Sequence, residues 1–173
     1  DVERIEIARG PISSIYGAAA FLGVVNVITR LPEERERVEA RFQTGSFGER
    51  TATLSGAAKL GTGLSVAGGF SLRHSDGPDL YFPEYDAPET NNGRAFGRNA
   101  DRFRQGFIQL SWGDLMFEAR AVSREKYIPT GVYEVIFNDP RTKTKDARSY
   151  GDLRYQHTGQ NGGRFLAHLS IDD

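Results

Sequence analysis

The chain has 173 residues, no cysteine, a formal net charge of -1 and 38% hydrophobic residues. The lack of cysteine excludes a disulfide framework and thiolate metal sites, and a net charge near zero provides no basic face for nucleic acid. No stretch approaches the roughly 18 apolar residues of a membrane helix, but a mean hydropathy of -0.49 is also typical of transmembrane barrels, in which half of each strand faces a polar lumen.

The first thirty residues contain two strand patterns separated by a helical turn. Alternation over residues 2–7 predicts a short half-buried strand, and the β-branched run over residues 23–30 predicts a second one. Pro11 fits the first position of a helical turn, because it lacks an N–H and its φ is already helical. Gly17 fits the left-handed cap after that turn. The order predicts a compact α/β unit.

Residues 3–30 read E-R-I-E-I-A-R-G-P-I-S-S-I-Y-G, then A-A-A-F-L, then G-V-V-N-V-I-T-R. This order resembles the C-terminal end of the plug domain of TonB-dependent outer-membrane receptors. The family writes E-R-I-E-V-x-R-G-P-x-S-x-L-Y-G, then small residues, then G-G-V-I-N-I-I-T-K. The chain departs from that pattern at Leu22, where the family usually has a first glycine. The resemblance implies that residues 1–31 end a plug domain and that a large membrane β-barrel follows.

The resemblance also implies roles for Arg9 and Glu6. In the family the arginine that matches Arg9 belongs to a cluster of ion pairs between plug and barrel wall, so both residues are expected to contact the barrel. A buried arginine needs such a partner, because removing one side of a buried pair costs roughly 3–5 kcal/mol. The alternative is a solvent-facing Arg9 in a loop, since arginine is mostly exposed in proteins.

From Val38 onward, apolar and polar residues alternate with a period of two. The clearest case is residues 64–73, in which Leu64, Val66 and Phe70 share one face while Ser65 and Ser71 share the other. The pattern recurs at residues 38–43, 51–55, 105–112, 115–124 and 164–171. Strands of about ten residues with one apolar face are typical of a lipid-facing barrel, whereas soluble sandwiches have strands of about five or six residues. The pattern predicts a transmembrane antiparallel β-barrel, with about seven N-terminal strands in residues 38–173.

The connections between these predicted strands alternate in length. Short turns are predicted near residues 45–48, 60–63, 113–114 and 159–163, and the long connections are expected over residues 75–102 and 126–148. Because bacterial barrels have short periplasmic turns and longer extracellular loops, we expect both long connections outside the cell. Seven strands leave an open edge that hydrocarbon does not tolerate. The chain is therefore expected to be a fragment of a barrel of roughly 22 strands.

The family resemblance implies active import across the outer membrane of a Gram-negative bacterium. The expected ligand is scarce and bulky: a ferric siderophore first, with haem, cobalamin or a glycan left open. Energy would come from TonB, through an N-terminal segment expected to be missing here together with the signal peptide and most of the plug. Outer-membrane lipid and lipopolysaccharide are the other expected partners, and no cofactor is expected. The alternatives are a passive porin or structural barrel, a soluble all-β binding module, and an outer-membrane enzyme.

Aromatic and cationic residues gather in both long connections. Rigid rings offer stacking area and cations pair with charge, so these side chains suit an anionic, aromatic iron chelate. The ligand-binding candidates are Tyr81, Phe82, Tyr85, Tyr133 and Arg141. The alternative is that the aromatic residues pack the loops together while the basic residues contact lipopolysaccharide phosphates.

Catalytic and metal sites are not predicted. The chain has no cysteine nucleophile, no G-x-S-x-G and no H-E-x-x-H. His74, His157 and His168 fall on separate predicted strands without the spacing of metal ligands. We therefore expect a protein that is not an enzyme.

Overall fold

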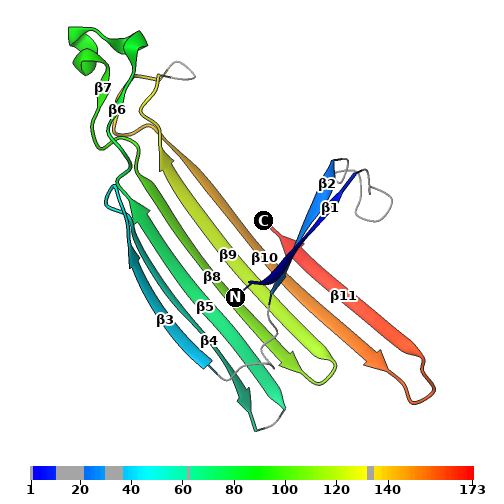
Figure 1. Ribbon diagram of the computed structural model, residues 1–173. Helices are drawn as coiled ribbons and strands as arrows, with labels where there is room; N and C mark the ends of the chain where they lie inside the picture. The colour runs from blue at the N-terminus through cyan, green and yellow to red at the C-terminus, as the bar shows by residue number, and fades with distance from the viewer. Residues whose placement is uncertain (1, 11–21, 30–36, 62, 132–134) are drawn as a thin grey trace.

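The computed structural model describes residues 2–10, 22–29, 37–61, 63–131 and 135–173 (Figure 1). Strands β1 (Val2–Arg9) and β2 (Gly23–Thr29) form an antiparallel hairpin that is separate from the main sheet. Both strands that the N-terminal pattern predicts are thus confirmed. The predicted helical turn from Pro11 to Gly17 lies outside the described residues.

A single antiparallel sheet contains most of the chain. Each strand pairs with its predecessor in the order β3-β4-β5-β8-β9-β10-β11, so the sheet is a meander. Figure 1 shows the short turns that follow β4, β8 and β10 at one end of the sheet, and the two long connections together with the short turn between β3 and β4 at the other. The strands are β3 (Arg37–Thr44), β4 (Arg50–Leu60), β5 (Leu64–Ser75), β8 (Asp101–Trp112), β9 (Leu115–Tyr127), β10 (Lys143–Thr158) and β11 (Arg164–Asp172).

The strands are long and their turns are tight. Strand β9 has 13 residues and β10 has 16, against about five or six in an average strand of a soluble protein. Gly113 has φ 55° in the two-residue turn between β8 and β9, a left-handed conformation that glycine adopts at no steric cost. In the part of the chain that the structure describes, β3 and β11 are the two edges of the sheet, and the sheet does not close.

The start of β10 differs from the sequence prediction. The second long connection was expected to extend to residue 148, but pairing with β9 begins already at Lys143, opposite Tyr127, and continues through Arg148, opposite Val122. The connection therefore covers residues 128–142 only. The prediction was wrong because residues 143–148 carry polar side chains on both faces of the strand, with Ala147 as the one apolar residue. Hydropathy alternation cannot reveal a strand that extends beyond the apolar band.

The burial of side chains in this sheet is the reverse of that in a soluble protein. The register aligns apolar residues of all seven strands on one face, and these residues are exposed: Phe70 is 50% and Trp112 is 63% accessible. On the opposite face Ser65, Gln109 and Ser111 are only 4–7% accessible. A soluble antiparallel sheet buries its apolar face and solvates its polar one. The exposed apolar face is therefore built to contact apolar surroundings outside the chain.

Candidate ligand-binding loops and inner wall

The first long connection is a compact structure of its own. Strands β6 (Leu80–Tyr81) and β7 (Arg94–Ala95) pair, and the 3-10 helices η2 (Pro83–Tyr85) and η3 (Pro88–Gly93) lie between them. Each helix begins at a proline, where a missing N–H costs nothing. Gly93 has φ 67°, and a Cβ on it would lie 2.4 Å from the carbonyl oxygen of Phe82. The connection is therefore a folded unit rather than an open loop.

An aromatic cluster joins the two long connections. Tyr85 stacks on Phe137 with ring centroids 4.3 Å apart, and Phe82 meets Phe137 edge-on at 5.8 Å. The backbone N–H of Gly131 donates to Tyr85 Oη at 3.2 Å. Phe137 is 9% accessible, so it is the buried centre of the cluster. The structure thus places two ligand candidates, Phe82 and Tyr85, in contacts that hold the connections together.

Other aromatic residues of the first connection remain accessible. Tyr81 and Phe96 are each 53% exposed. Tyr81 Oη donates to Asp86 at 2.8 Å, and this hydrogen bond raises the pKa of Tyr81. Tyr133 lies outside the described residues. Of the rings that the structure describes in this connection, Tyr81 and Phe96 therefore offer the most surface to a ligand.

Arg141 is exposed and is held by one carboxylate. Its guanidinium donates to Asp139 through Nε at 3.0 Å and through Nη2 at 2.7 Å, and its backbone N–H donates to the same carboxylate at 2.8 Å. These bonds lower the pKa of Asp139 to about 2, with the side-chain bonds as the largest cause. Arg141 thus lies at the end of the sheet where the long connections are (Figure 1), and its guanidinium group is held in one orientation.

The lowered pKa of Asp139 predicts the pH range over which its pairing with Arg141 stabilises the turn that contains both residues. Because the folded pKa of Asp139 lies below its ordinary value of 3.8, the pairing stabilises the turn fully above that value and is lost as the pH falls toward 2. We expect the carboxyl carbon of Asp139 to titrate near 2 in a carbon-13 NMR experiment on the full-length receptor. In Arg141→Gln the midpoint should rise toward the ordinary value. A midpoint near 4 in the unmodified protein would mean that the pairing does not form.

The polar face of the sheet is a network of paired charges. Arg124 Nε donates to Asp101 at 3.1 Å, and Tyr150 Oη donates to Glu118 at 2.5 Å. Further contacts on this face join Arg148 to Asp172 and His168 to Asp152. Within the described residues, the buried Nε of Arg120 has no hydrogen-bond partner. The Arg120 guanidinium lies over the ring of Phe107 at 5.4 Å. This face is hydrophilic, and most of its charged groups pair with one another.

The N-terminal hairpin shows different surroundings for its two predicted contact residues. Glu6 accepts hydrogen bonds from Arg4 at 2.8 Å and from Asn26 at 3.3 Å, and these bonds lower the pKa of Glu6. Arg9 is exposed and has no hydrogen-bond partner among the residues that the structure describes. Ile5 and Ile7 are 57% and 64% accessible. Within the described residues, the hairpin thus presents an arginine without a hydrogen-bond partner and an apolar face.

Metal sites and membrane helices are not found in the described segments. No group of three or more histidine and acidic residues in them is placed to hold a metal ion. No helix in the same segments has the length and apolar character to cross a membrane.

Comparison with known proteins identifies the family. The vitamin B12 transporter BtuB of Vibrio vulnificus is 35% identical over 123 residues, which is 68% of this chain and 20% of that protein. The ferric enterobactin receptor PirA of Pseudomonas aeruginosa is 32% identical over 120 residues, 65% of this chain and 16% of that protein. The chain belongs to the TonB-dependent outer-membrane receptors. This receptor chain is also 50% identical to an iron-regulated outer membrane virulence protein of Vibrio cholerae over 71 residues, 38% of this chain and 11% of that protein.

The receptor chain spans a fifth or less of the length of these relatives. No family model and no solved structure matches it. Membership confirms the family that the sequence resembles and the location in the outer membrane of a Gram-negative bacterium. The relatives are transporters and receptors rather than enzymes.

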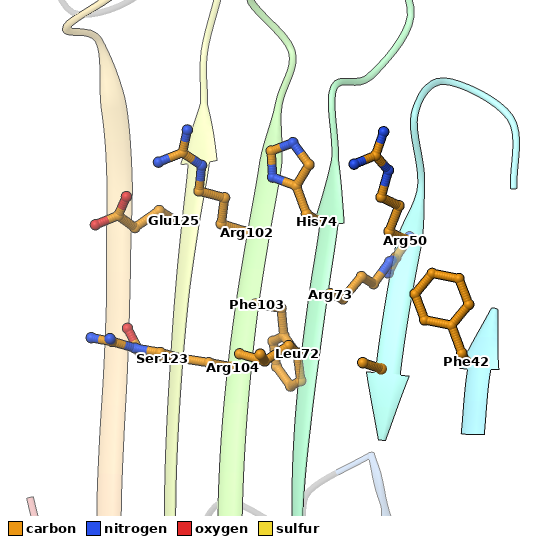
Figure 2. A pocket seen from close by; sticks show the side chains of 11 residues that line it. Phe42, Arg50, Leu72, Arg73, His74, Arg102, Phe103, Arg104, Ser123 and Glu125 are labelled. Atoms are coloured by element: carbon orange, nitrogen blue, oxygen red, sulfur yellow. The ribbon is translucent and has the colours of Figure 1, made fainter. Parts of the chain in front are cut away.

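Sequence reasoning missed three features of the receptor. Phe137 is not among the predicted ligand-binding residues, and its place at the centre of the cluster depends on two connections that are far apart in sequence. The lack of a hydrogen-bond partner for Arg120 Nε among the described residues has no sequence signal, because it depends on which side chains the strand register brings together. A row of charged side chains on the exposed apolar face, from Arg50 through His74 to Arg102, exists only because the register places these residues side by side on β4, β5 and β8 (Figure 2).

Proposed function

We propose that the receptor is an active transporter that captures a scarce, bulky ligand, in the first place a ferric siderophore, and imports it with energy from TonB. The observation that carries this proposal is the reversed burial of the seven-stranded sheet, with long connections gathered at one end. Such a sheet is the wall of a transmembrane β-barrel whose apolar face contacts lipid and whose charged face lines the lumen. Later strands beyond this chain would close the barrel, because open sheet edges do not occur in hydrocarbon.

The N-terminal hairpin is proposed to be the end of the plug that fills the lumen. A two-stranded hairpin alone is marginally stable in water. Ile5 pairs with Val27 and Ile7 pairs with Val25, so these exposed side chains form one apolar face. That face needs the rest of a plug domain to cover it. Arg9, which has no hydrogen-bond partner among the described residues, and Glu6 on the same strand stay the proposed contacts with the barrel wall.

Ligand capture is assigned to the outer end of the molecule. The accessible ring of Tyr81 and the oriented guanidinium of Arg141 provide stacking area and positive charge for an anionic chelate. Tyr133 remains a proposed third contact. Phe82 and Tyr85 support the site because they hold the two connections together in the aromatic cluster. If either ring contacts a ligand directly, it does so through the ring edge that the cluster leaves open. Two relatives bear names that refer to iron, and this favours a ferric ligand.

An uptake experiment separates active transport from a passive porin. Cells that express the full-length receptor are given radiolabelled ferric siderophores of several classes and, separately, labelled cyanocobalamin. We expect one ligand to accumulate, and accumulation to stop when TonB is deleted or a protonophore is added, while binding at the cell surface persists. If the amount of labelled ligand in the cells instead rises in proportion to its external concentration, and neither TonB deletion nor the protonophore changes it, the result would support the passive barrel.

A further inference from the structure

Two arginines share one carboxylate where the two long connections meet. The pKa of Asp139 is lowered first by its hydrogen bonds with Arg141 and, less strongly, by the charge of Arg98, which belongs to the first connection. In the described part of the chain, these are the two charges that act on the pKa of this carboxylate. One anion therefore faces two cations, and one positive charge is left over at this junction.

Backbone hydrogen bonds bring the segment that contains Arg98 next to the second connection. Immediately before β8, the carbonyl of Ala100 accepts a hydrogen bond from the N–H of Tyr127, the last residue of β9, at 2.9 Å. Two residues further along the chain, the carbonyl of Pro129 accepts one from the N–H of Asn138 at 2.8 Å. The segment before β8 and the segment around Asn138 therefore both flank the residues that follow β9. The backbone thus holds all three charged groups at one junction.

The junction contains a buried donor and a buried acceptor that the described residues do not satisfy. Within those residues, the buried Nε atom of Arg98 has no hydrogen-bond partner, and neither has the buried Oδ1 atom of Asn138. Buried polar groups are nearly always hydrogen-bonded, because leaving one unbonded costs free energy. The two unsatisfied atoms favour a second arrangement of this junction in which Arg98 is bonded.

Arg141 and Asp139 differ in their access to solvent. The side chain of Arg141 is 84% accessible, whereas that of Asp139 is 12% accessible. A ligand from outside therefore reaches the guanidinium more easily than the carboxylate. Asp139 occupies the edge of the guanidinium that Nε and Nη2 form, so an anion that binds this edge displaces Asp139. An ionised carboxylate with little access to solvent is unfavourable without a partner.

We propose that Arg98 is a positioning residue for Arg141: it pairs with Asp139 when an anionic ligand displaces Asp139 from the Nε–Nη2 edge of Arg141. The proposal rests on the proposed function, because it takes Arg141 to contact the ligand. Rotation about the side-chain bonds of Arg98 redirects its guanidinium toward the carboxylate. The exchange leaves Asp139 paired in both states, so ligand capture does not strand its charge. Arg98 itself does not touch the ligand.

Titration of Asp139 in the full-length receptor tests the exchange without any ligand. In Arg141→Gln the carbon-13 midpoint of Asp139 should rise but stay below its ordinary value of 3.8, because Arg98 then pairs with the carboxylate. In the double variant Arg98→Gln, Arg141→Gln the midpoint should rise by about one further pH unit, since no cation then pairs with the carboxylate. Arg98→Met with Arg141→Gln also removes the charge, and gives the same test if the first double variant folds poorly.

Two further substitutions in the Arg141→Gln background serve as controls. Arg98→Lys keeps a positive charge, so the midpoint of Asp139 should stay low. Arg94→Gln removes an exposed cation from the same connection and should leave the midpoint unchanged. Equal midpoints in Arg141→Gln and in its double variant with Arg98→Gln would overturn the proposal. A rise of the same size with Arg94→Gln would overturn it too, because the effect would then reflect net charge rather than pairing.

Affinity for a ligand probe tests whether binding uses the exchange. The purified full-length receptor is titrated at neutral pH with ferric enterobactin, an anionic siderophore complex. Arg98→Gln should weaken binding about tenfold where Asp139 is present, and less than about twofold in the Asp139→Asn background, because the neutral amide leaves no charge to be stranded. Equal loss in both backgrounds would overturn the exchange, since Arg98 would then act on the ligand or on the fold. If the probe does not bind, ferric enterobactin is not the ligand of the proposed function, and the titration of Asp139 still decides the role of Arg98.

Discussion

Replacing Phe137 with alanine in the full-length receptor is expected to release the two long connections from each other. Phe137 is the shared partner of Tyr85 and Phe82, and it is the buried ring of the cluster. Removing a buried phenylalanine costs about 3 kcal/mol or more, to which its ring pairs contribute. The opening equilibrium of residues 135–142 should therefore rise about 100-fold. Hydrogen exchange measured by mass spectrometry should detect this, most clearly at Asn138, whose N–H donates to Pro129 at 2.8 Å.

A matched control is available in the first connection. Phe96 is 53% exposed, so Phe96→Ala should change the stability of the connections by no more than about 0.5 kcal/mol. Affinity for the ligand should fall in Phe137→Ala, because binding must then also order the connections. Unchanged exchange over residues 135–142 in Phe137→Ala would show that the cluster does not hold the connections.

The second large effect is a loss of stability, expected when a substitution introduces a charge on the exposed apolar face of the sheet. Ile108 lies in the middle of β8 on that face, between Gly68 and Ala119. An arginine near the bilayer midplane of a barrel costs about 2–4 kcal/mol. Ile108→Arg should lower the free energy of unfolding of the receptor in lipid vesicles by that amount, measured by denaturant titration of tryptophan fluorescence.

The control for this variant lies on the same strand. Gln105 faces the opposite, polar side of β8, so Gln105→Arg should cost less than about 1 kcal/mol. The pair of variants keeps the strand and the added charge the same and places the charge on opposite faces, at positions three residues apart. Equal destabilisation by Ile108→Arg and Gln105→Arg would contradict the assignment of one face to lipid and the other to the lumen.

The sequence alone determined the strands and the two faces. Alternation is a local property, since successive side chains of a strand point to opposite sides, and residues 64–73 display it without any partner strand. Tight turns were also readable, because Gly113 and its counterparts mark places where the chain must adopt left-handed conformations. The family resemblance of the first thirty residues was equally local. Where the pattern weakened, at residues 143–148, the strand boundary was missed.

Only the tertiary structure decided which distant residues meet. The stacking of Tyr85 on Phe137 joins two connections that no sequence spacing relates. Likewise, the row from Arg50 to Arg102 exists only through the pairing register of β4, β5 and β8. A one-residue slip in one of these pairings would move the side chains of that strand to the other face. Side-chain periodicity is set by the backbone of each strand, whereas register and loop packing are set by the free energy of the whole sheet.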